Sequence, residues 1–239
     1  GRKLVDTKHV FKIKANNDGF VDRFKDRLVA RGFRAIFGID YYQTHASVVR
    51  KETVRLMTAL AARLDLHFTA IDISGAFLEA TLGRPIYAKI EGDEKPPKPG
   101  MVRELTKALY GVPPAPREWQ IQFTKNLLGW GFSRSTFDPC LFYKKKGKDM
   151  VYICLYVDDN GCYRTKGSKI YEDFCKKVNQ RYKASISDDK DVYLGMRFRR
   201  TAPFHYSIDQ ERYCVDAMKA YGFWGNTKEA HTPSNGEEL

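Results

Sequence analysis

The sequence lacks the features that mark several common classes of protein. No apolar run approaches the roughly 20 residues that a membrane-spanning helix needs, and no secretory signal pattern opens the chain. The five cysteines form no C-x-x-C pair and the five histidines are scattered, which argues against a disulfide framework and against a structural zinc site. We therefore expect reduced, mostly buried thiols, an intracellular reducing compartment and no membrane partner.

Acidic residues are also scarce relative to basic ones. The 239 residues include 41 Lys and Arg but 29 Asp and Glu, which gives a formal net charge of +12. A chain with this excess favours a polyanion, most often nucleic acid, and the alternative is a basic surface without such a partner. Because 43% of the residues are hydrophobic and 13% aromatic, we expect a globular chain with a real core.

The N-terminal region predicts a basic β-hairpin. Residues 10–14 alternate between apolar and basic side chains, "NNDG" (16–19) supplies a turn, and residues 20–29 return. The cations of this region are Lys12, Lys14, Arg23, Lys25, Arg27 and Arg31. Such a hairpin either protects a solvated sheet edge from aggregation or holds phosphates.

Apolar periodicity predicts both helices and strands in the rest of the chain. Helices are expected at about 52–64, at 115–128, from a cap at Ser168 onward and at 208–221. Strands are expected at 68–73, 151–157 and 193–198. This order predicts the α+β class, with an antiparallel sheet and helices packed on one of its faces.

Three aspartates lie where two predicted strands end. Asp72 closes the apolar strand 68–73, and Asp158 and Asp159 follow the apolar run 151–157. If these strands pair, three carboxylates meet at one sheet edge, and like charges so close together require a cation. Oxygen ligands suit Mg²⁺ or Mn²⁺, and two such ions about 4 Å apart are the arrangement used in nucleotidyl transfer. The simpler alternatives are a capping Asp and a turn made by Asn160 and Gly161.

Several longer stretches resemble one known family. "LYVDD" (155–159) resembles the Y-x-D-D box of reverse transcriptases, and "AIDISGAFL" (70–78) resembles the motif that carries their first catalytic Asp. The flanking text is similar, in order and spacing, to copia-type LTR-retrotransposon reverse transcriptases, in the stretches "RFKDRLVARGF", "GIDYYQTHASVVRKETVRL", "APREW", "GFSRSTFDPCLFYKK", "YLGMRF" and "HTP". The resemblance covers about residues 10–233.

This resemblance implies a right-hand polymerase fold. It places the fingers at 1–70, the palm with the first catalytic Asp at 71–91, and an insertion and helix between fingers and palm at 92–130. The palm resumes at 131–203 with the YVDD hairpin, and the thumb begins at 204–239. An RNA template, a primer and deoxynucleoside triphosphates are the implied partners, and two Mg²⁺ or Mn²⁺ ions are the implied cofactors.

The resemblance also assigns roles to single residues. Asp72, Asp158 and Asp159 are the implied catalytic and metal-binding triad, and the backbone carbonyl of Ile73 is a further metal ligand. Phe77 lies where the family has its steric gate against a ribose 2′-hydroxyl. The implied nucleotide-binding set comprises Phe77, Lys25, Arg27, Tyr156 and Pro114, with either Lys25 or Arg27 contacting the triphosphate.

Three departures from the family pattern leave a second interpretation open. Pro114 stands where the family has a Gln that lies against the incoming nucleotide, and proline offers neither a side-chain donor nor an N–H. "NGCY" follows the Y-x-D-D box where the family has an apolar strand, and the sequence ends at Leu239, where the family continues toward an RNase H domain. The chain is therefore either an RNA-directed DNA polymerase or a domesticated, non-catalytic subunit that binds structural RNA within a ribonucleoprotein.

Overall fold

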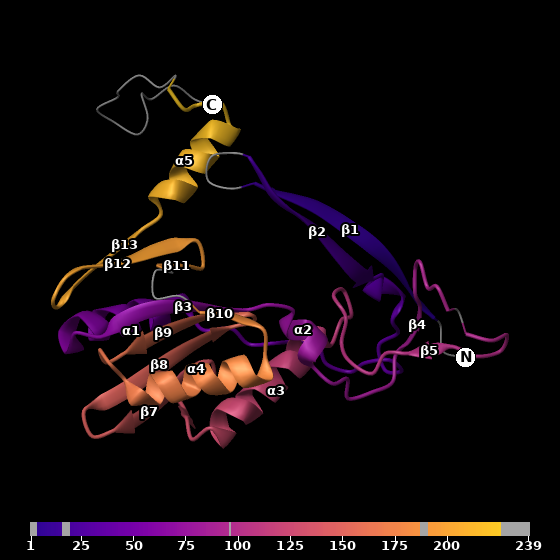
Figure 1. Ribbon diagram of the computed structural model, residues 1–239, viewed down its shortest axis with the longest axis horizontal. Helices are drawn as coiled ribbons and strands as arrows, with labels where there is room; N and C mark the ends of the chain where they lie inside the picture. The colour runs from indigo at the N-terminus through magenta and orange to yellow at the C-terminus, as the bar shows by residue number, and fades with distance from the viewer. Residues whose placement is uncertain (1–3, 16–19, 96, 187–190, 226–239) are drawn as a thin grey trace.

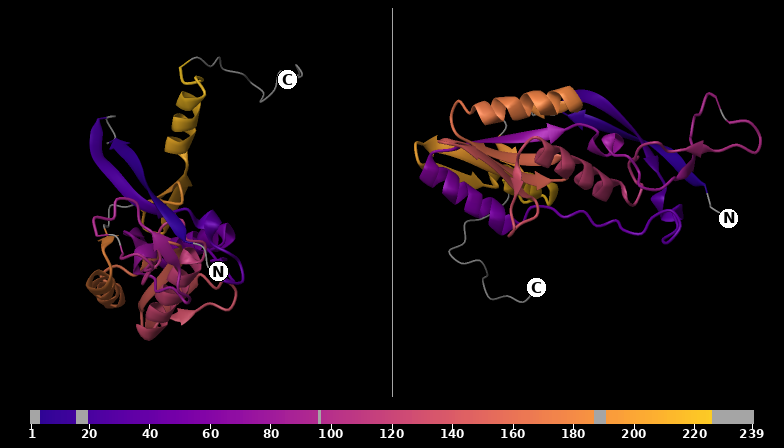
Figure 2. Two further views of the ribbon diagram at one scale, coloured as in Figure 1. Left: turned by 90° about the vertical axis from the view of Figure 1, so that its right-hand side faces the viewer. Right: turned by 90° about the horizontal axis from the view of Figure 1, so that it is seen from below.

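The computed structural model describes residues 4–15, 20–95, 97–186 and 191–225, so the predicted turn at 16–19 lies outside the described residues. Figure 1 shows an arm formed by β1 (Val5–Ala15) and β2 (Val21–Ala30), a body of sheet and helices, and a projecting helix α5 (Glu211–Ala220). The arm and α5 rise from the same side of the body, with space between them (Figure 2).

The body is built on an antiparallel sheet of six strands, ordered β10-β3-β9-β8-β7-β6. The strands are β3 (His67–Ile73), β6 (Ser133–Arg134), β7 (Leu141–Lys146), β8 (Asp149–Tyr156), β9 (Asp159–Arg164) and β10 (Ala184–Ile186). The predicted strands at 68–73 and 151–157 are thus confirmed within a residue or two. Strands β3 and β8 are largely buried, which explains why their sequences read as apolar runs and do not alternate.

Helices pack on both faces of this sheet, so the expectation of one covered face was wrong. The hydroxyl of Thr58 in α1 (Lys51–Leu64) lies 2.8 Å from the hydroxyl of Tyr163, whereas the next strand residue, Arg164, lies over the ring of Tyr171 in α4 (Lys169–Arg181). Adjacent strand residues point to opposite faces. Helix α3 (Ala115–Gly129) is also amphipathic and buries Trp119.

The arm belongs to a separate sheet ordered β2-β1-β4-β5, with short strands β4 (Tyr87–Lys89) and β5 (Arg103–Glu104). β1 and β2 are antiparallel, and Lys12 pairs with Lys25 and Lys14 with Arg23. A 3₁₀ turn (Gly32–Arg34) and the short helix α2 (Ala76–Glu79) complete the elements between arm and body. The predicted basic hairpin is therefore confirmed in its two strands.

The C-terminal region differs from the expectation. The strand expected at 193–198 is a hairpin of β11 (Val192–Tyr193) and β12 (Met196–Ala202), turned at Gly195, and β13 (His205–Asp209) follows. Ile208 therefore lies in a strand, and the last helix begins only at Glu211. Short strands interrupted by glycine carry too little periodicity to be separated by sequence.

None of the five cysteines forms a disulfide. Cys140, Cys154 and Cys162 are buried, as expected, while Cys175 is half-buried and Cys214 is exposed. In the described part of the chain, none of the helices combines the length and the apolar character that crossing a lipid bilayer demands.

Candidate active site

The register of the central strands brings the predicted carboxylates together. Asp72 of β3 lies directly opposite Asp159 of β9, and Asp159 lies opposite Tyr156 of β8. Directly opposed residues share a face of the sheet, so these three side chains form one row across neighbouring strands. The N–H of Ile73 donates to the carbonyl oxygen of Asp158 at 2.9 Å, which joins the ends of the two strands.

The turn of the β8–β9 hairpin is made by Val157 and Asp158, because Tyr156 pairs with Asp159. The prediction that Asn160 and Gly161 make the turn was wrong. Val157 has a φ of 57°, a left-handed conformation that is unusual for a β-branched residue. Glycine is normal at the first position of such tight hairpins, so this backbone is strained at the point where it presents Asp158.

Trp119 holds the strained turn in place. Its indole N–H donates to the carbonyl oxygen of Val157 at 2.7 Å, and its buried ring stacks on Phe123 with centroids 5.1 Å apart. In the sequence, Trp119 falls within the helix predicted at 115–128. Its polar contact could not be found from periodicity, which reports burial and not hydrogen bonding.

Asn160 and Gly161 are buried residues of β9. The strand that follows the Y-x-D-D box is therefore covered by the rest of the domain, although its sequence is polar. A Cβ at Gly161 would lie 3.0 Å from the ring of Tyr193 and 3.2 Å from that of Phe68. The hydroxyl of Tyr193 donates to the carbonyl oxygen of Cys154 at 3.0 Å. Gly161 is therefore required for Tyr193 to lie flat on the sheet, one row behind Asp72 and Asp159.

The arm places cations near the carboxylates. Burial raises the pKa of Asp158 above its usual range, and the carboxylate of Asp72 raises this pKa further, whereas Arg27 and Lys25 lower it. Burial and the neighbouring cations of the arm, Arg27 first, lower the pKa of Lys25, and Asp72 opposes that shift. The predicted phosphate-contacting residues thus act electrostatically on two of the predicted catalytic aspartates.

The donor chemistry of Asp72, Asp158, Asp159 and the Ile73 carbonyl fits a hard divalent cation. Three carboxylates and the backbone carbonyl of Ile73 supply the oxygen atoms that Mg²⁺ and Mn²⁺ prefer. Within the described ranges, no group of three acidic, His or Cys side chains is close enough to hold an ion together. The convergence of Asp72, Asp158 and Asp159 on shared ions stays a prediction, which rests on the strand register.

Tyr110 connects the arm to the predicted nucleotide site. The guanidinium carbon of Arg27 lies 5.1 Å from the centre of its ring, and Phe77 meets the same ring edge-on at 5.7 Å. The N–H of Ala30 donates to the carbonyl oxygen of Tyr110 at 2.7 Å. Gly111, with a φ of 84°, lies so close to Ala30 that any side chain would collide with that backbone. Sequence reasoning assigned Tyr110 no role.

Comparison with known sequences assigns the family. Residues 1–235 match the family described as "Reverse transcriptase (RNA-dependent DNA polymerase)". The chain is 31% identical over 216 residues to the "Retrovirus-related Pol polyprotein from transposon RE1" of Arabidopsis thaliana, covering 90% of the chain and 15% of that relative. It is 31% identical over 242 residues to the corresponding polyprotein from transposon TNT 1-94 of Nicotiana tabacum, covering 99% of the chain and 18% of the relative. The chain belongs to the copia-type reverse transcriptase family.

These relatives are much longer than the chain, which spans less than a fifth of either. The end of this reverse transcriptase sequence at Leu239 therefore does not favour the non-catalytic interpretation. Of the three departures named above, Pro114 is the one on which the non-catalytic interpretation rests.

Pro114 caps the N-terminus of α3 in the reverse transcriptase domain and lines a hollow of about 220 Å³. Tyr42, Arg84 and Arg117 line the same hollow, and the guanidinium carbon of Arg84 lies 4.2 Å from the centre of the Tyr42 ring. The backbone at Pro114 has φ −77° and ψ −7°, a helical conformation open to any residue. Pro114 therefore offers no side-chain donor and does not distort the start of α3.

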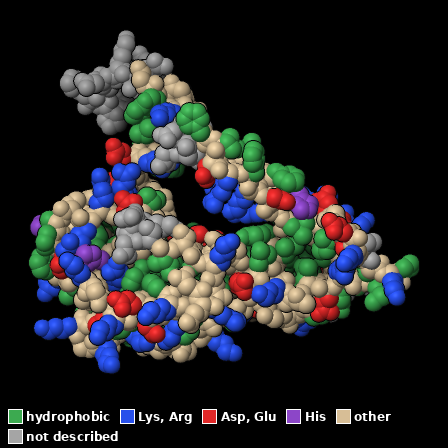
Figure 3. All heavy atoms as spheres, viewed as in Figure 1, with side chains coloured by type: hydrophobic (Ala, Val, Ile, Leu, Met, Phe, Trp, Pro, Cys, Tyr) green, Lys and Arg blue, Asp and Glu red, His purple; other side chains and the backbone are tan. Residues whose placement is uncertain are grey.

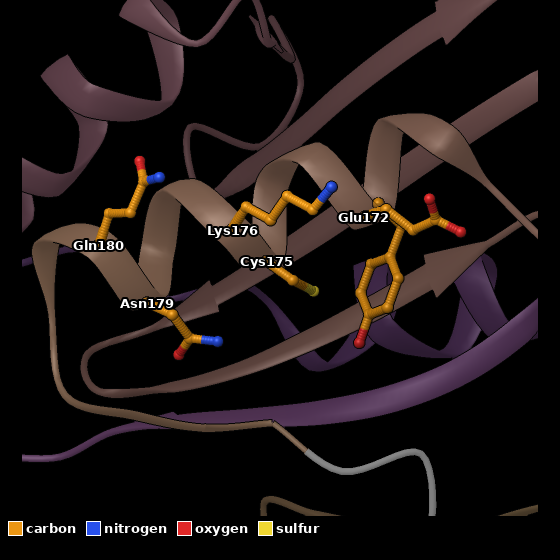
Figure 4. Close-up of a pocket in the computed structure, with 6 residues that line it drawn as sticks. Glu172, Cys175, Lys176, Asn179 and Gln180 are labelled. Carbon is orange, nitrogen blue, oxygen red and sulfur yellow. The ribbon is translucent and has the colours of Figure 1, made fainter.

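A larger groove lies elsewhere, along the outer side of α4 (Figure 4). It measures about 530 Å³ and is lined by Tyr171, Glu172, Cys175, Lys176, Asn179 and Gln180. All of these residues belong to α4, and none belongs to the predicted polymerase site. A groove lined by a single helix is only a depression in the surface. Asp72, Asp158 and Asp159 therefore remain the candidate active site of this reverse transcriptase domain.

Proposed function

We propose that the chain is an RNA-directed DNA polymerase whose catalytic carboxylates are Asp72, Asp158 and Asp159. The observation that carries this proposal is the cross-strand pairing of Asp72 with Asp159, beside a strained turn that presents Asp158. Divalent ions bound by these carboxylates and the Ile73 carbonyl would activate the primer 3′-hydroxyl and stabilise the leaving pyrophosphate.

The arrangement of the domain supports a right-hand polymerase. In this proposal the arm within 1–70 acts as fingers, the six-stranded sheet acts as palm, and α5 within 204–239 begins the thumb. Figure 3 shows an opening bordered by the arm, the body and α5, with Lys and Arg side chains along the arm's inner edge. A basic channel of this kind suits a template–primer duplex.

In this proposal, different side chains contact different parts of the nucleotide. Lys25 and Arg27 face the carboxylate row and would bind the triphosphate. Phe77, which meets Tyr110 edge-on, would lie against the sugar and exclude a 2′-hydroxyl. Tyr156 ends the row opposite Asp159 and would contact the last base pair.

A second candidate function rests on Pro114. A reverse transcriptase-like domain that lacks a nucleotide contact could be retained as a subunit that binds structural RNA, with the aspartates as relics. Both functions predict that RNA binding weakens with salt. For each phosphate neutralised, the binding constant should fall by about 0.7–0.9 log units per tenfold rise in salt concentration. Only the first function predicts polymerase activity, so an activity measurement distinguishes the two.

Primer extension on an RNA template, in Mg²⁺ or Mn²⁺, tests the polymerase proposal. We expect slow but measurable extension by the native chain and none by Asp158→Asn, with unchanged binding to template–primer. Asp173→Asn is the matched control, because Asp173 is an exposed carboxylate of α4 that pairs with Lys177. Tight binding without extension in either metal would reject the polymerase and leave the RNA-binding subunit.

A further inference from the structure

The end of the six-stranded sheet that lies away from the aspartates is unusually basic. Residues 143–150 and 164–169 contain seven Lys and Arg but only one acidic residue, Asp149. These stretches therefore carry a net charge of +6, which is half of the net +12 of the whole chain. The aspartate row lies at the opposite end of the same strands, since β8 extends from Asp149 to Tyr156 over roughly 23 Å. Figure 3 shows Lys and Arg side chains protruding from the lower left end of the body, where Figure 1 labels β7.

Five exposed lysines dominate this end of the sheet. This lysine cluster comprises Lys145, Lys146, Lys148, Lys166 and Lys169. In the described part of the chain, no ion pair involves any of them, whereas Lys177 further along α4 pairs with Asp173 at 2.8 Å. The carboxylate of Asp149 is directed toward the start of α4, where it accepts from the N–H of Ile170 at 3.1 Å. Ion pairs within the domain therefore leave the positive charge of the cluster uncompensated.

Hydrogen bonds hold the two segments that carry the cluster side by side. The β7–β8 hairpin closes in a two-residue turn, because Lys146 pairs with Asp149. The hydroxyl oxygen of Thr165 accepts from the N–H of Met150 at 3.1 Å, and the N–H of Thr165 donates to the carbonyl oxygen of Met150 at 3.1 Å. A ligand that bridges both segments would therefore not have to order their backbones first.

An exposed aromatic pair lies beside the cluster. Tyr143, which is 42% exposed, pairs with Tyr152 across β7 and β8, and their ring centroids are 6.5 Å apart. Lys145 follows Tyr143 by two residues along β7, so the two side chains share a face of the sheet. Aromatic rings on which bases stack, next to cations that neutralise phosphates, are the combination that binds single-stranded nucleic acid.

We propose that the lysine cluster and Tyr143 form a second nucleic-acid site, which binds a single strand outside the channel between the arm, the body and α5. Charge complementarity favours a polyanion there. Flexible lysines spread over two turns, without a pocket, match the repeated phosphates of a backbone better than one small anion. An acidic protein surface could also neutralise the lysines, but it would give the exposed ring no base to stack on.

This site acts in binding and not in the chemistry of polymerisation. A strand that is bound both in the channel and at the cluster would be held more tightly than by either alone. The proposal does not depend on polymerase activity, because none of its residues lies in the aspartate row.

Fluorescence anisotropy of a labelled single-stranded oligouridylate, about ten nucleotides long, tests this proposal. The test variant removes three charges of the cluster, as Lys145→Gln/Lys146→Gln/Lys148→Gln. The matched control removes the same charge from exposed lysines elsewhere, as Lys95→Gln/Lys98→Gln/Lys125→Gln. The cluster variant should bind at least about tenfold more weakly at low salt, and its salt dependence should fall by up to about 2 log units per tenfold salt. The control should bind like the native chain.

Tyr143→Leu tests whether the strand is bound through its bases. Loss of a stacking ring should weaken binding of the oligouridylate at least about fivefold, whereas a blunt duplex, whose bases already stack on one another, should bind as it does to the native chain. Unchanged melting curves would verify that the variants fold. Extension at saturating template–primer should be the same in the native chain and the cluster variant, so loss of the second site and loss of the polymerase give different results.

Equal losses in the cluster variant and its control would show that overall charge binds the strand, and would overturn the site. Native affinity in the cluster variant would overturn it as well. An equal effect of Tyr143→Leu on the duplex and on the single strand would contradict binding through unpaired bases.

Discussion

The indole N–H of Trp119 donates to the carbonyl oxygen of Val157, 38 residues away in the chain, at 2.7 Å. This bond fixes the first residue of a two-residue turn whose second residue is Asp158. Val157 adopts a left-handed φ of 57°, which costs roughly 1–2 kcal/mol for a residue with a Cβ. A buried contact from α3 thus stabilises a strained backbone that presents a candidate catalytic carboxylate.

Trp119→Phe should weaken this turn while keeping an aromatic ring in the core. Leaving the Val157 carbonyl without its donor should destabilise the fold by about 1–3 kcal/mol, and each kcal/mol lowers the melting temperature by about 2–4 °C in a domain of this size. Extension activity should fall more than template binding does. Trp224→Phe is the control, since Trp224 is 52% exposed, and equal melting shifts in both variants would contradict the role of the bond.

Gly161→Ala should destabilise the six-stranded sheet. The new methyl group would lie 3.0 Å from the ring of Tyr193, which is itself held by a hydrogen bond to Cys154. Overpacking of this kind typically costs about 1–3 kcal/mol. Gly129→Ala, at the end of α3 with no atom within 4 Å of its Cβ position, should be neutral or stabilising in chemical denaturation. A neutral Gly161→Ala would show that Tyr193 can move freely.

Asp158→Asn should raise the melting temperature at neutral pH. Burial, and then the carboxylate of Asp72, raise the pKa of Asp158 in the folded chain, above the value of about 3.9 expected when unfolded. The folded state therefore binds this proton more tightly, and stability is lost as the pH rises through the raised pKa. The amide avoids this loss, so its advantage should be largest at pH 7 and vanish below about pH 3.5.

Thermal unfolding of both proteins between acid and neutral pH measures the difference. Asp173→Asn should show no such pH-dependent gain. A melting temperature for Asp158→Asn that is equal to or below that of the native chain at pH 7 would contradict the raised pKa of Asp158.

Pro114→Gln should improve nucleotide use. The helical dihedrals at Pro114 accept glutamine without strain, and an N–H in the first turn of a helix needs no intrahelical partner. A restored neutral hydrogen bond contributes about 0.5–1.5 kcal/mol, or up to about tenfold in rate or affinity. Steady-state incorporation should show a lower KM for the deoxynucleotide. No gain from Pro114→Gln, next to measurable native activity, would mean that this position does not contact the nucleotide.

Sequence reasoning located strands β3 and β8 of the six-stranded sheet and the three aspartates because strand periodicity and buried apolar runs are local signals. Strands β3 and β8 and helices α1 and α3 were predicted within about two residues of their observed bounds, and α4 begins directly after the predicted cap. The Ser168 cap was also confirmed, since its hydroxyl accepts from the N–H of Tyr171 at 3.0 Å.

The errors concern properties that depend on tertiary contacts. Asn160-Gly161 has the composition of a turn, but Gly161 is needed for the approach of Tyr193, and the strained Val157 makes the turn instead. The hydrogen bond from Trp119 of α3 to the carbonyl oxygen of Val157 stabilises a turn that the local sequence does not favour. The links from Trp119 and Tyr110 join segments far apart in the chain, so no pattern within one segment predicts them.

Single-nucleotide incorporation on a saturating RNA template–primer, compared between the native chain and Asp72→Asn, tests the polymerase most directly. Asp72 is opposite Asp159 across two strands, and ions held by such carboxylates supply several kcal/mol to the reaction. We therefore predict incorporation by the native chain and a loss of at least about 10³-fold in Asp72→Asn, at equal template–primer affinity. Incorporation that is absent from the native chain, or equal in both proteins, would contradict a catalytic site at these aspartates.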